Sequence, residues 1–214
     1  VPGGSYHEYL ISGILIQTIA FGMMGPASSM ATDMLEGIVD RFRTLPMSRS
    51  AFLVGHIFAE LAGMLLAITV LSLSGFAVGW TISSSFGEAA AGYALLIVFA
   101  FTMIWIGTLL GVMVRSPDAV MGVGFIVVFP LTFVASTFVP IDGLPDGLRQ
   151  LAEWNPISSL AAATRTLFGN PTAIPADAAW PLQHPVLASV IWCAVLLAVV
   201  IPVTIRAFRR RTTG

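Results

Sequence analysis

The densest group of charged side chains in this chain lies in a short segment, 33–49, between two long apolar stretches. Charged residues make up only 10% of the sequence, yet this segment holds Asp33, Glu36, Asp40, Arg41, Arg43 and Arg49. Between them, apolar residues recur at helical spacing, namely Leu35, Ile38, Val39 and Phe42. The pattern predicts a surface helix over 33–46, ended at Pro46, whose charged face is a docking site for another protein. The alternative is a solvated loop whose charges only fix the topology, but acidic residues contribute little to topology.

A second polar group, His56 and Glu60, falls inside a long apolar stretch. The two residues lie four apart, so on a helix they share a face and are placed to form a hydrogen bond. An ionisable side chain at membrane depth is costly and indicates a function. The alternative is a structural role, because Glu60 lies only about 14 Å along a helix that starts at Ala51 and can reach towards the membrane interface.

Motifs for bond-making chemistry and for nucleotide binding are missing from the sequence. A Walker A loop requires a lysine, and the chain contains none. The three histidines are scattered and Cys193 is the single cysteine, so no metal-ligand spacing occurs. No G-x-S-x-G nucleophile motif is present either. We therefore expect no catalytic residue, no metal and no cofactor bound by this chain, so its energy must come from a partner or from a gradient.

The elements that must position these residues are five long apolar segments. Hydrophobic residues make up 57% of the 214 residues, against roughly 45–50% in ordinary soluble domains. A helix needs about 20 apolar residues to cross a bilayer, and lipid offers no partners for backbone groups. The sequence therefore predicts one all-α, polytopic membrane domain, with spans at 10–30, 51–79, 89–114, 119–139 and 185–205.

The arginines indicate how these spans are oriented. With five alternating crossings, Arg149 and Arg165 fall on one side, and eight arginines fall on the other: Arg41, Arg43, Arg49, Arg115, Arg206, Arg209, Arg210 and Arg211. The positive-inside rule makes the second side cytoplasmic, so the C-terminus is expected inside and the N-terminus outside. Because no signal-like segment opens the chain, we expect at least one preceding span to be missing.

The segment 140–184 is expected outside the membrane on the other face. Asn155-Pro156 is a helix start signal, and Gly169-Asn-Pro171 is a stop signal. Between them an amphipathic stripe predicts a short helix packed on the outer face of the bundle. The short Arg115–Asp118 segment requires the two spans on either side of it to form an antiparallel hairpin.

Two spans carry residues suited to line a hydrophobic substrate path. Phe125, Phe129 and Phe133 repeat every four residues in span 119–139, where Pro130 predicts a kink. Span 10–30 contributes Phe21 and Met24, in an adaptable stretch rich in glycine and methionine. The alternative for such a stripe is ordinary packing or contact with lipid.

Two blocks of residues resemble one family. Gly37, Asp40, Arg41, Arg43, Pro46 and Arg49 match the G-x-x-D-R-x-R-x-x-P-x-x-R pattern of the first cytoplasmic loop of ABC-2 type permeases, most closely the daunorubicin-resistance subgroup. The block from Glu153 through Arg165 to Gly169 is similar to the segment before the last span of those permeases. The tight turn at Ser116 also fits, so the resemblance extends over essentially the whole chain.

This resemblance implies a half of a type V ABC exporter in the bacterial inner membrane. Such a transporter has two permeases, as a homodimer or a heterodimer, with six spans each, and two separate ATPase subunits that bind ATP and magnesium. The resemblance assigns 33–49 to the coupling helix in the ATPase groove, and 140–184 to outer re-entrant helices. It places the substrate path at the permease dimer interface, with spans 10–30 and 119–139 as walls. The family's first span has no counterpart here.

The sequence leaves the cargo and two rival functions open. Aromatic and methionine-rich walls suit hydrophobic or amphiphilic drugs, and they suit lipids equally well. One rival is a gradient-driven transporter or channel that uses Glu60 and His56, and the other is a membrane scaffold that moves nothing. The expected partners are ABC ATPases, a second permease and membrane lipid, with no nucleic acid.

Overall fold

The fold is a bundle of helices, seen in a computed structural model that describes residues 6–38, 49–114, 116–135, 146–171, 174–175 and 177–213. Within these ranges every regular element is α-helical. In chain order the helices are α1 (Tyr6–Gly22), α2 (Met24–Leu35), α4 (Arg49–Ala77), α5 (Phe86–Met113), α6 (Pro117–Val134), α7 (Asp146–Glu153), α8 (Pro156–Leu167), α9 (Trp180–Gln183) and α10 (Pro185–Thr213).

Five stretches of the described chain are long and apolar enough to cross a membrane. They are Glu8–Leu35, Ala51–Ala77, Phe86–Met113, Pro117–Val134 and Pro185–Arg211. Each overlaps one of the spans expected from the sequence, so the prediction of an all-α polytopic membrane protein is confirmed. The first of these stretches is composed of α1 and α2, which are separated only by Met23.

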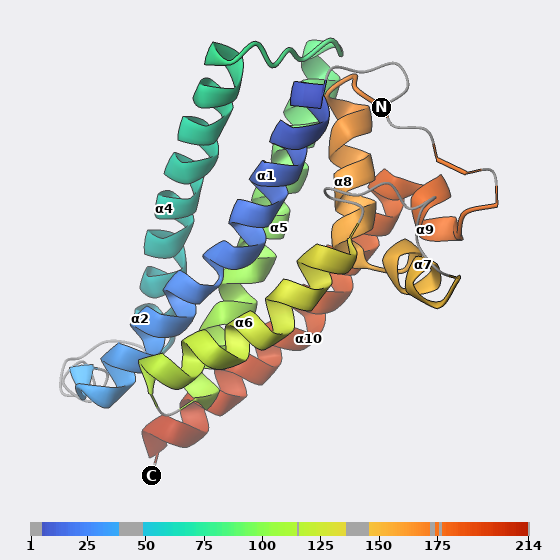
Figure 1. Cartoon of the computed structure of the whole chain (residues 1–214). Helices are drawn as coiled ribbons and strands as arrows, with labels where there is room; N and C mark the ends of the chain where they lie inside the picture. The colour runs from blue at the N-terminus through green and yellow to red at the C-terminus, as the bar shows by residue number, and fades with distance from the viewer. Residues whose placement is uncertain are drawn as a thin grey trace.

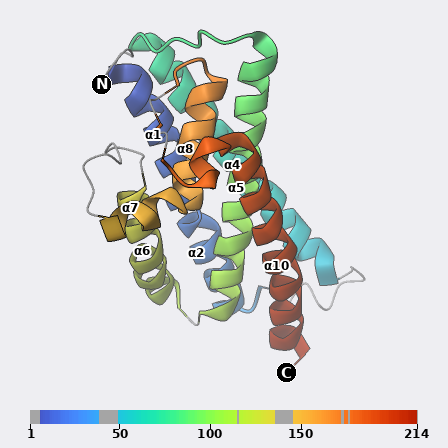
Figure 2. The same ribbon diagram turned by 90° about the vertical axis from the view of Figure 1, so that its right-hand side faces the viewer.

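Helix α5 is the centre of the bundle and packs against α1, α2, α4, α8 and α10 (Figures 1 and 2). Its contact with α2 is close because two glycines face α2. A Cβ at Gly107 would collide with the carbonyl oxygen of Met23, and one at Gly111 with that of Ala27. The two glycines lie four residues apart, the spacing that lets membrane helices approach closely.

The helix ends show why the chain turns where it does. Ser116 caps α6 by accepting a hydrogen bond from the Ala119 amide at 3.2 Å, and Pro117 occupies the first turn. These signals produce the tight α5–α6 hairpin that the sequence predicts. Helix α2 continues to Leu35 and ends before Gly37, whose φ of +67° is the left-handed conformation typical of a helix end. Asp33 is therefore in the last turn of α2, which corrects the expected start of a surface helix at this residue.

Helices α7, α8 and α9 cover the bundle away from the C-terminus (Figure 2). The predicted short helix is α8: the Asn155 side chain accepts from the Ile157 amide at 2.9 Å, and Gly169 follows its end with φ +79°. Phe168 is fully buried, with its ring 5.3 Å from that of Trp80. The resemblance implied several short helices in 140–184, but the residues themselves did not predict where α7 and α9 lie, because each is shorter than the windows in which periodicity is visible.

Candidate functional site

The charged segment predicted to dock a partner connects the end of α2 to the start of α4. Glu36 and Gly37 are described and form the turn after α2. The docking residues Asp40, Arg41, Arg43 and Pro46 lie outside the described residues, as does the side chain of Arg49, the first residue of α4. The docking helix therefore stays a prediction, now confined to the chain after Gly37.

The five predicted path residues come together on one side of the bundle. Phe125, Phe129 and Phe133 stack along α6, with successive ring centroids 5.1 Å apart. Phe21 of α1 meets the start of this aromatic ladder, its ring 5.9 Å from that of Phe125. Met24 packs over Gly124. A Cβ atom added to this glycine would lie 3.5 Å from both Cγ and Cε of Met24, an ordinary contact distance.

The aromatic ladder lies on the surface of the chain rather than in its core. Its three rings are 50%, 41% and 73% exposed in chain order. The buried side of α6 is instead formed by Val120, Gly124, Val128 and Thr132. The ladder is therefore not part of this chain's buried core, and its exposed rings can face lipid, a second subunit or a passing solute.

The polar residues at membrane depth form a cluster between α2 and α4. The Ser29 hydroxyl donates a 2.7 Å hydrogen bond to Oε1 of Glu60. His56 and Asp33 interact electrostatically with Glu60 and with each other. The Nε2 atom of His56 is buried and has no hydrogen-bond partner within the described chain. The expected Glu60–His56 hydrogen bond is replaced by one to Ser29, so the pair extends into a four-residue cluster across two helices.

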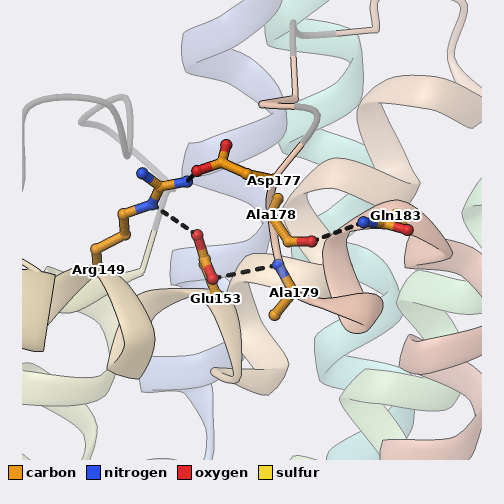
Figure 3. Close-up of polar contacts among 6 residues, drawn as sticks. All are labelled: Arg149, Glu153, Asp177, Ala178, Ala179 and Gln183. Carbon is orange, nitrogen blue, oxygen red and sulfur yellow. Dashed lines mark hydrogen bonds and ion pairs between the residues drawn. The ribbon is translucent and has the colours of Figure 1, made fainter.

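A second polar network lies in the outer segment and is drawn in Figure 3. Arg149 of α7 donates from Nε to Oε1 of Glu153 and from Nη2 to Oδ2 of Asp177, both at 2.8 Å. The amide of Ala179 donates to the other oxygen of Glu153 at 3.2 Å. Hydrogen bonds to Glu153 and then to Asp177 raise the pKa of Arg149 above its ordinary value. We call Arg149, Glu153, Asp177 and Ala179 the outer clasp, because they fasten α7 to the segment before α9.

Two further residues anchor α8 to the spans. The Asn155 side chain donates a 2.7 Å hydrogen bond to the Leu131 carbonyl of α6. Arg165 is buried on α8, where its guanidinium lies 3.6 Å from the Tyr9 ring centroid and donates to the Tyr9 carbonyl at 3.3 Å. Burial lowers the pKa of Arg165 below its ordinary value. These contacts connect α8, together with α7 and α9 the cover of this end of the bundle, to α6 and α1.

Little in the sequence predicts the outer clasp and the Ser29 contact. The four-residue spacing of Arg149 and Glu153 is a local signal for an ion pair. Asp177 and Ser29, in contrast, lie 28 and 31 residues from their partners in the chain. No group of three or more metal-ligating side chains occurs in the part of the chain that the structure describes.

This architecture defines a class of protein: a multi-pass α-helical membrane protein with one end of the bundle covered by short helices and an exposed aromatic face along α6. The chain belongs to the ABC-2 type transporter family, whose model matches residues 3–168. The family resemblance drawn from the two sequence blocks is thereby confirmed.

The chain is also similar to drug-resistance permeases. It is 29% identical over 206 residues to the daunorubicin resistance ABC transporter permease protein DrrB1 of Streptomyces coeruleorubidus, covering 96% of this chain and 70% of that protein. It is 22% identical over 192 residues to the doxorubicin resistance ABC transporter permease protein DrrB of Mycobacterium tuberculosis, covering 89% and 66%. It is 26% identical over 145 residues to the linearmycin resistance permease protein LnrN of Bacillus subtilis, covering 68% and 37%.

Proposed function

We propose that this chain is the permease subunit of an ATP-driven exporter that moves hydrophobic or amphiphilic compounds, drugs or lipids, out across a bacterial inner membrane. Its family and the drug-resistance names of its relatives support this function. The structural observation that carries the proposal is the exposed aromatic ladder Phe125–Phe129–Phe133 beside Phe21. Stacked rings on an outward face offer flat apolar cargo contact area without requiring hydrogen bonds.

The proposed transporter contains two permeases and two ATPase subunits. The ladder is then one wall of a path between this chain and the second permease, and Met24 lines the same wall. The ATPases bind ATP and magnesium, and closure of the ATPases tilts the helix bundle from an inward-facing to an outward-facing state. The segment 36–49 transmits this motion, because it connects two spanning helices directly.

The proposed orientation puts this segment and the C-terminus in the cytoplasm. Helices α2, α5 and α10 end at the same end of the bundle, where α4 and α6 begin (Figure 1). The connections and the tail at this end carry eight of the ten arginines. The positive-inside rule favours the cytoplasm for such an end, so the outer clasp and α8 face outwards.

Charge reversal in the coupling segment tests the proposal. Asp40→Arg or Arg41→Glu is expected to reduce permease-stimulated ATPase activity and cargo export by about fivefold or more, the scale of an ordinary coupling free energy. Asp118→Arg is the matched control, because Asp118 is exposed at the same end but belongs to α6. Membrane insertion should be unchanged in all three variants. Full stimulation and export in the first two would overturn the coupling claim.

A gradient-driven transporter is the second candidate, and the cluster around Glu60 is the observation that favours it. An acid held between two spans beside a histidine can bind and release a proton. The same export assay separates the two functions when ATP is depleted or the proton gradient is dissipated. Export that stops with ATP depletion and persists in Glu60→Gln supports the ATP-driven permease. Export that survives ATP depletion but is lost in Glu60→Gln supports the rival.

A further inference from the structure

Helix α7 is turned the opposite way from an amphipathic helix on a water-soluble protein. Arg149 and Glu153 point inwards, where they are joined in the outer clasp (Figure 3). The apolar residues Leu148 and Leu151, and Trp154 directly after the helix, are instead 43%, 65% and 57% exposed. The Trp154 amide bonds back to the preceding turn at 3.2 Å, so this residue continues the helical path.

These three exposed apolar residues form one continuous strip, which we call the α7 stripe. They are spaced three residues apart, so their side chains lie on the same side of the helix. The helix cannot rotate to bury them without breaking the clasp, because Arg149 and Glu153 are held on the opposite side by a separate segment of the chain. An apolar stripe fixed outwards in this way indicates a protein-binding or membrane-binding surface.

The α7 stripe lies at the level of the membrane. Asn155, the residue after Trp154, donates a 2.7 Å hydrogen bond to the Leu131 carbonyl of α6. Leu131 comes 14 residues after Pro117, the first residue of that span, which is about 21 Å along the helix. Even at a tilt of about 40° this distance rises about 16 Å, and half of the hydrocarbon core is about 15 Å. Trp154 therefore lies in the leaflet in which α6 ends.

Lipid fits this position better than a protein partner. Three side chains of at most about 250 Å² each, roughly half exposed, present well under the ~800 Å² that each partner of a stable protein interface buries. Leu131 is itself exposed, so the stripe continues an apolar surface of a spanning helix. Tryptophan is enriched at membrane interfaces, where its ring contacts acyl chains and its N–H reaches polar groups.

We propose that the α7 stripe is a lipid-binding surface that seats α7 among the acyl chains of the leaflet in which α6 ends. Amphipathic helices of this kind lie along the membrane with the apolar face about 5–10 Å into the boundary between headgroups and acyl chains. The outer clasp holds the other side of α7, so this helix connects the lipid to the protein. The surface requires only that the chain spans a membrane, and it does not depend on the proposed cargo or energy source.

Spin-label accessibility tests this surface in liposomes of phosphatidylethanolamine and phosphatidylglycerol. A nitroxide is attached to Leu151→Cys, and the buried Cys193 is replaced by alanine so that the label has one site. Oxygen, which concentrates in lipid, and a nickel chelate, which stays in water, are compared as relaxing agents. Gly87→Cys is the matched control: Gly87 is exposed in the first turn of α5, after the connection between two spans, and a Cβ there meets no atom within 4 Å.

We expect oxygen to relax the label at position 151 several-fold more than the nickel chelate does, and the order to be reversed at position 87. Equal access of the nickel chelate to both positions would place the stripe in water and overturn the proposal. A label at 151 that neither agent reaches would also overturn it, because the stripe would then be covered by protein, such as a second copy of this chain.

If Leu151→Cys does not fold, tryptophan fluorescence decides the question. The wild-type protein and Trp154→Phe are reconstituted with phospholipids that carry bromine on their acyl chains, which quench tryptophans in contact with them. Trp154 is exposed, whereas Trp80 and Trp105 are buried in the bundle. The quenched fraction of the fluorescence should therefore fall in Trp154→Phe. An unchanged fraction would show that Trp154 does not contact acyl chains, and the proposal would be wrong.

Discussion

At the scale of single residues, Glu153 holds the outer segment together. Both of its carboxylate oxygens are occupied, one by Arg149 and the other by the Ala179 amide. Its side chain is 8% exposed, whereas that of Asp177, the other acid bonded to Arg149, is 73% exposed. A buried charge-assisted hydrogen bond contributes more to stability than an exposed ion pair, which is screened by water. The two acids of the outer clasp should therefore differ in importance.

Replacing these acids one at a time tests that difference. Glu153→Ala leaves the Ala179 amide and Arg149 without their buried acceptor, so we expect an apparent melting temperature lower by a few degrees and faster hydrogen exchange in α7. Asp177→Ala removes only the exposed contact and should change neither measurement noticeably. Equal effects of the two substitutions on melting and exchange would show that the clasp does not depend on Glu153.

At the scale of elements, the contact between α2 and α5 is the tightest constraint on the fold. Gly107 and Gly111 bring α5 against the backbone carbonyls of Met23 and Ala27. Lipid is as apolar as the side chains, so packing of this kind supplies the attraction between spanning helices. Helix α2 is thereby fixed to the centre of the bundle, just beyond the interruption at Met23 that separates it from α1.

Gly111→Ala is expected to be destabilising because the new methyl group would overlap the Ala27 carbonyl and the Met30 side chain. Overpacking of this kind typically costs about 1–3 kcal/mol. Gly122→Ala in α6 is the matched control, since a Cβ there meets no atom within 4 Å. Thermal unfolding in detergent, followed by tryptophan fluorescence, should show a lower midpoint for Gly111→Ala alone. An unchanged midpoint would mean that α2 shifts without cost.

At the scale of the whole molecule, the aromatic ladder on α6 is connected to the cover formed by α7, α8 and α9. Asn155 begins α8 and also hydrogen-bonds to Leu131, in the ladder's own helix. Arg165 anchors the same α8 helix to Tyr9 of α1, the helix that carries Phe21. A movement of α6 relative to α1 must therefore strain contacts of α8, which is consistent with a path whose outer end opens and closes.

The role of the ladder is tested by Phe129→Ala, compared with Val127→Ala. Phe129 stacks between two rings, whereas Val127 is similarly exposed but lies on the opposite side of α6. If the ladder contacts cargo, Phe129→Ala should reduce export of an aromatic compound several-fold, and Val127→Ala should leave it near the wild-type rate. Equal export rates in the two variants would assign the ladder to lipid contact instead.

The spans, the α5–α6 hairpin and the ends of α8 could be predicted from the sequence because each depends on local chemistry. Apolar length determines whether a segment partitions into lipid, and Asn155, Pro156 and Ser116 act on the backbone within three residues of themselves. The positions of α7 and α9 could not be predicted from the residues, because eight and four residues are too few to show a period. The docking role of Asp40, Arg41 and Arg43 stays a prediction.

By itself, the sequence determined the number of membrane spans, the family, and the periodic placement of Phe125, Phe129 and Phe133 on one side of a helix. Only the tertiary structure decided that this side is exposed, that Glu60 bonds to Ser29, and that Glu153 joins two distant segments. The physical reason is one of range. Partitioning and helix formation act between neighbours in the chain, whereas the partner of a side chain depends on how each helix is rotated and how closely glycines such as Gly111 let it approach.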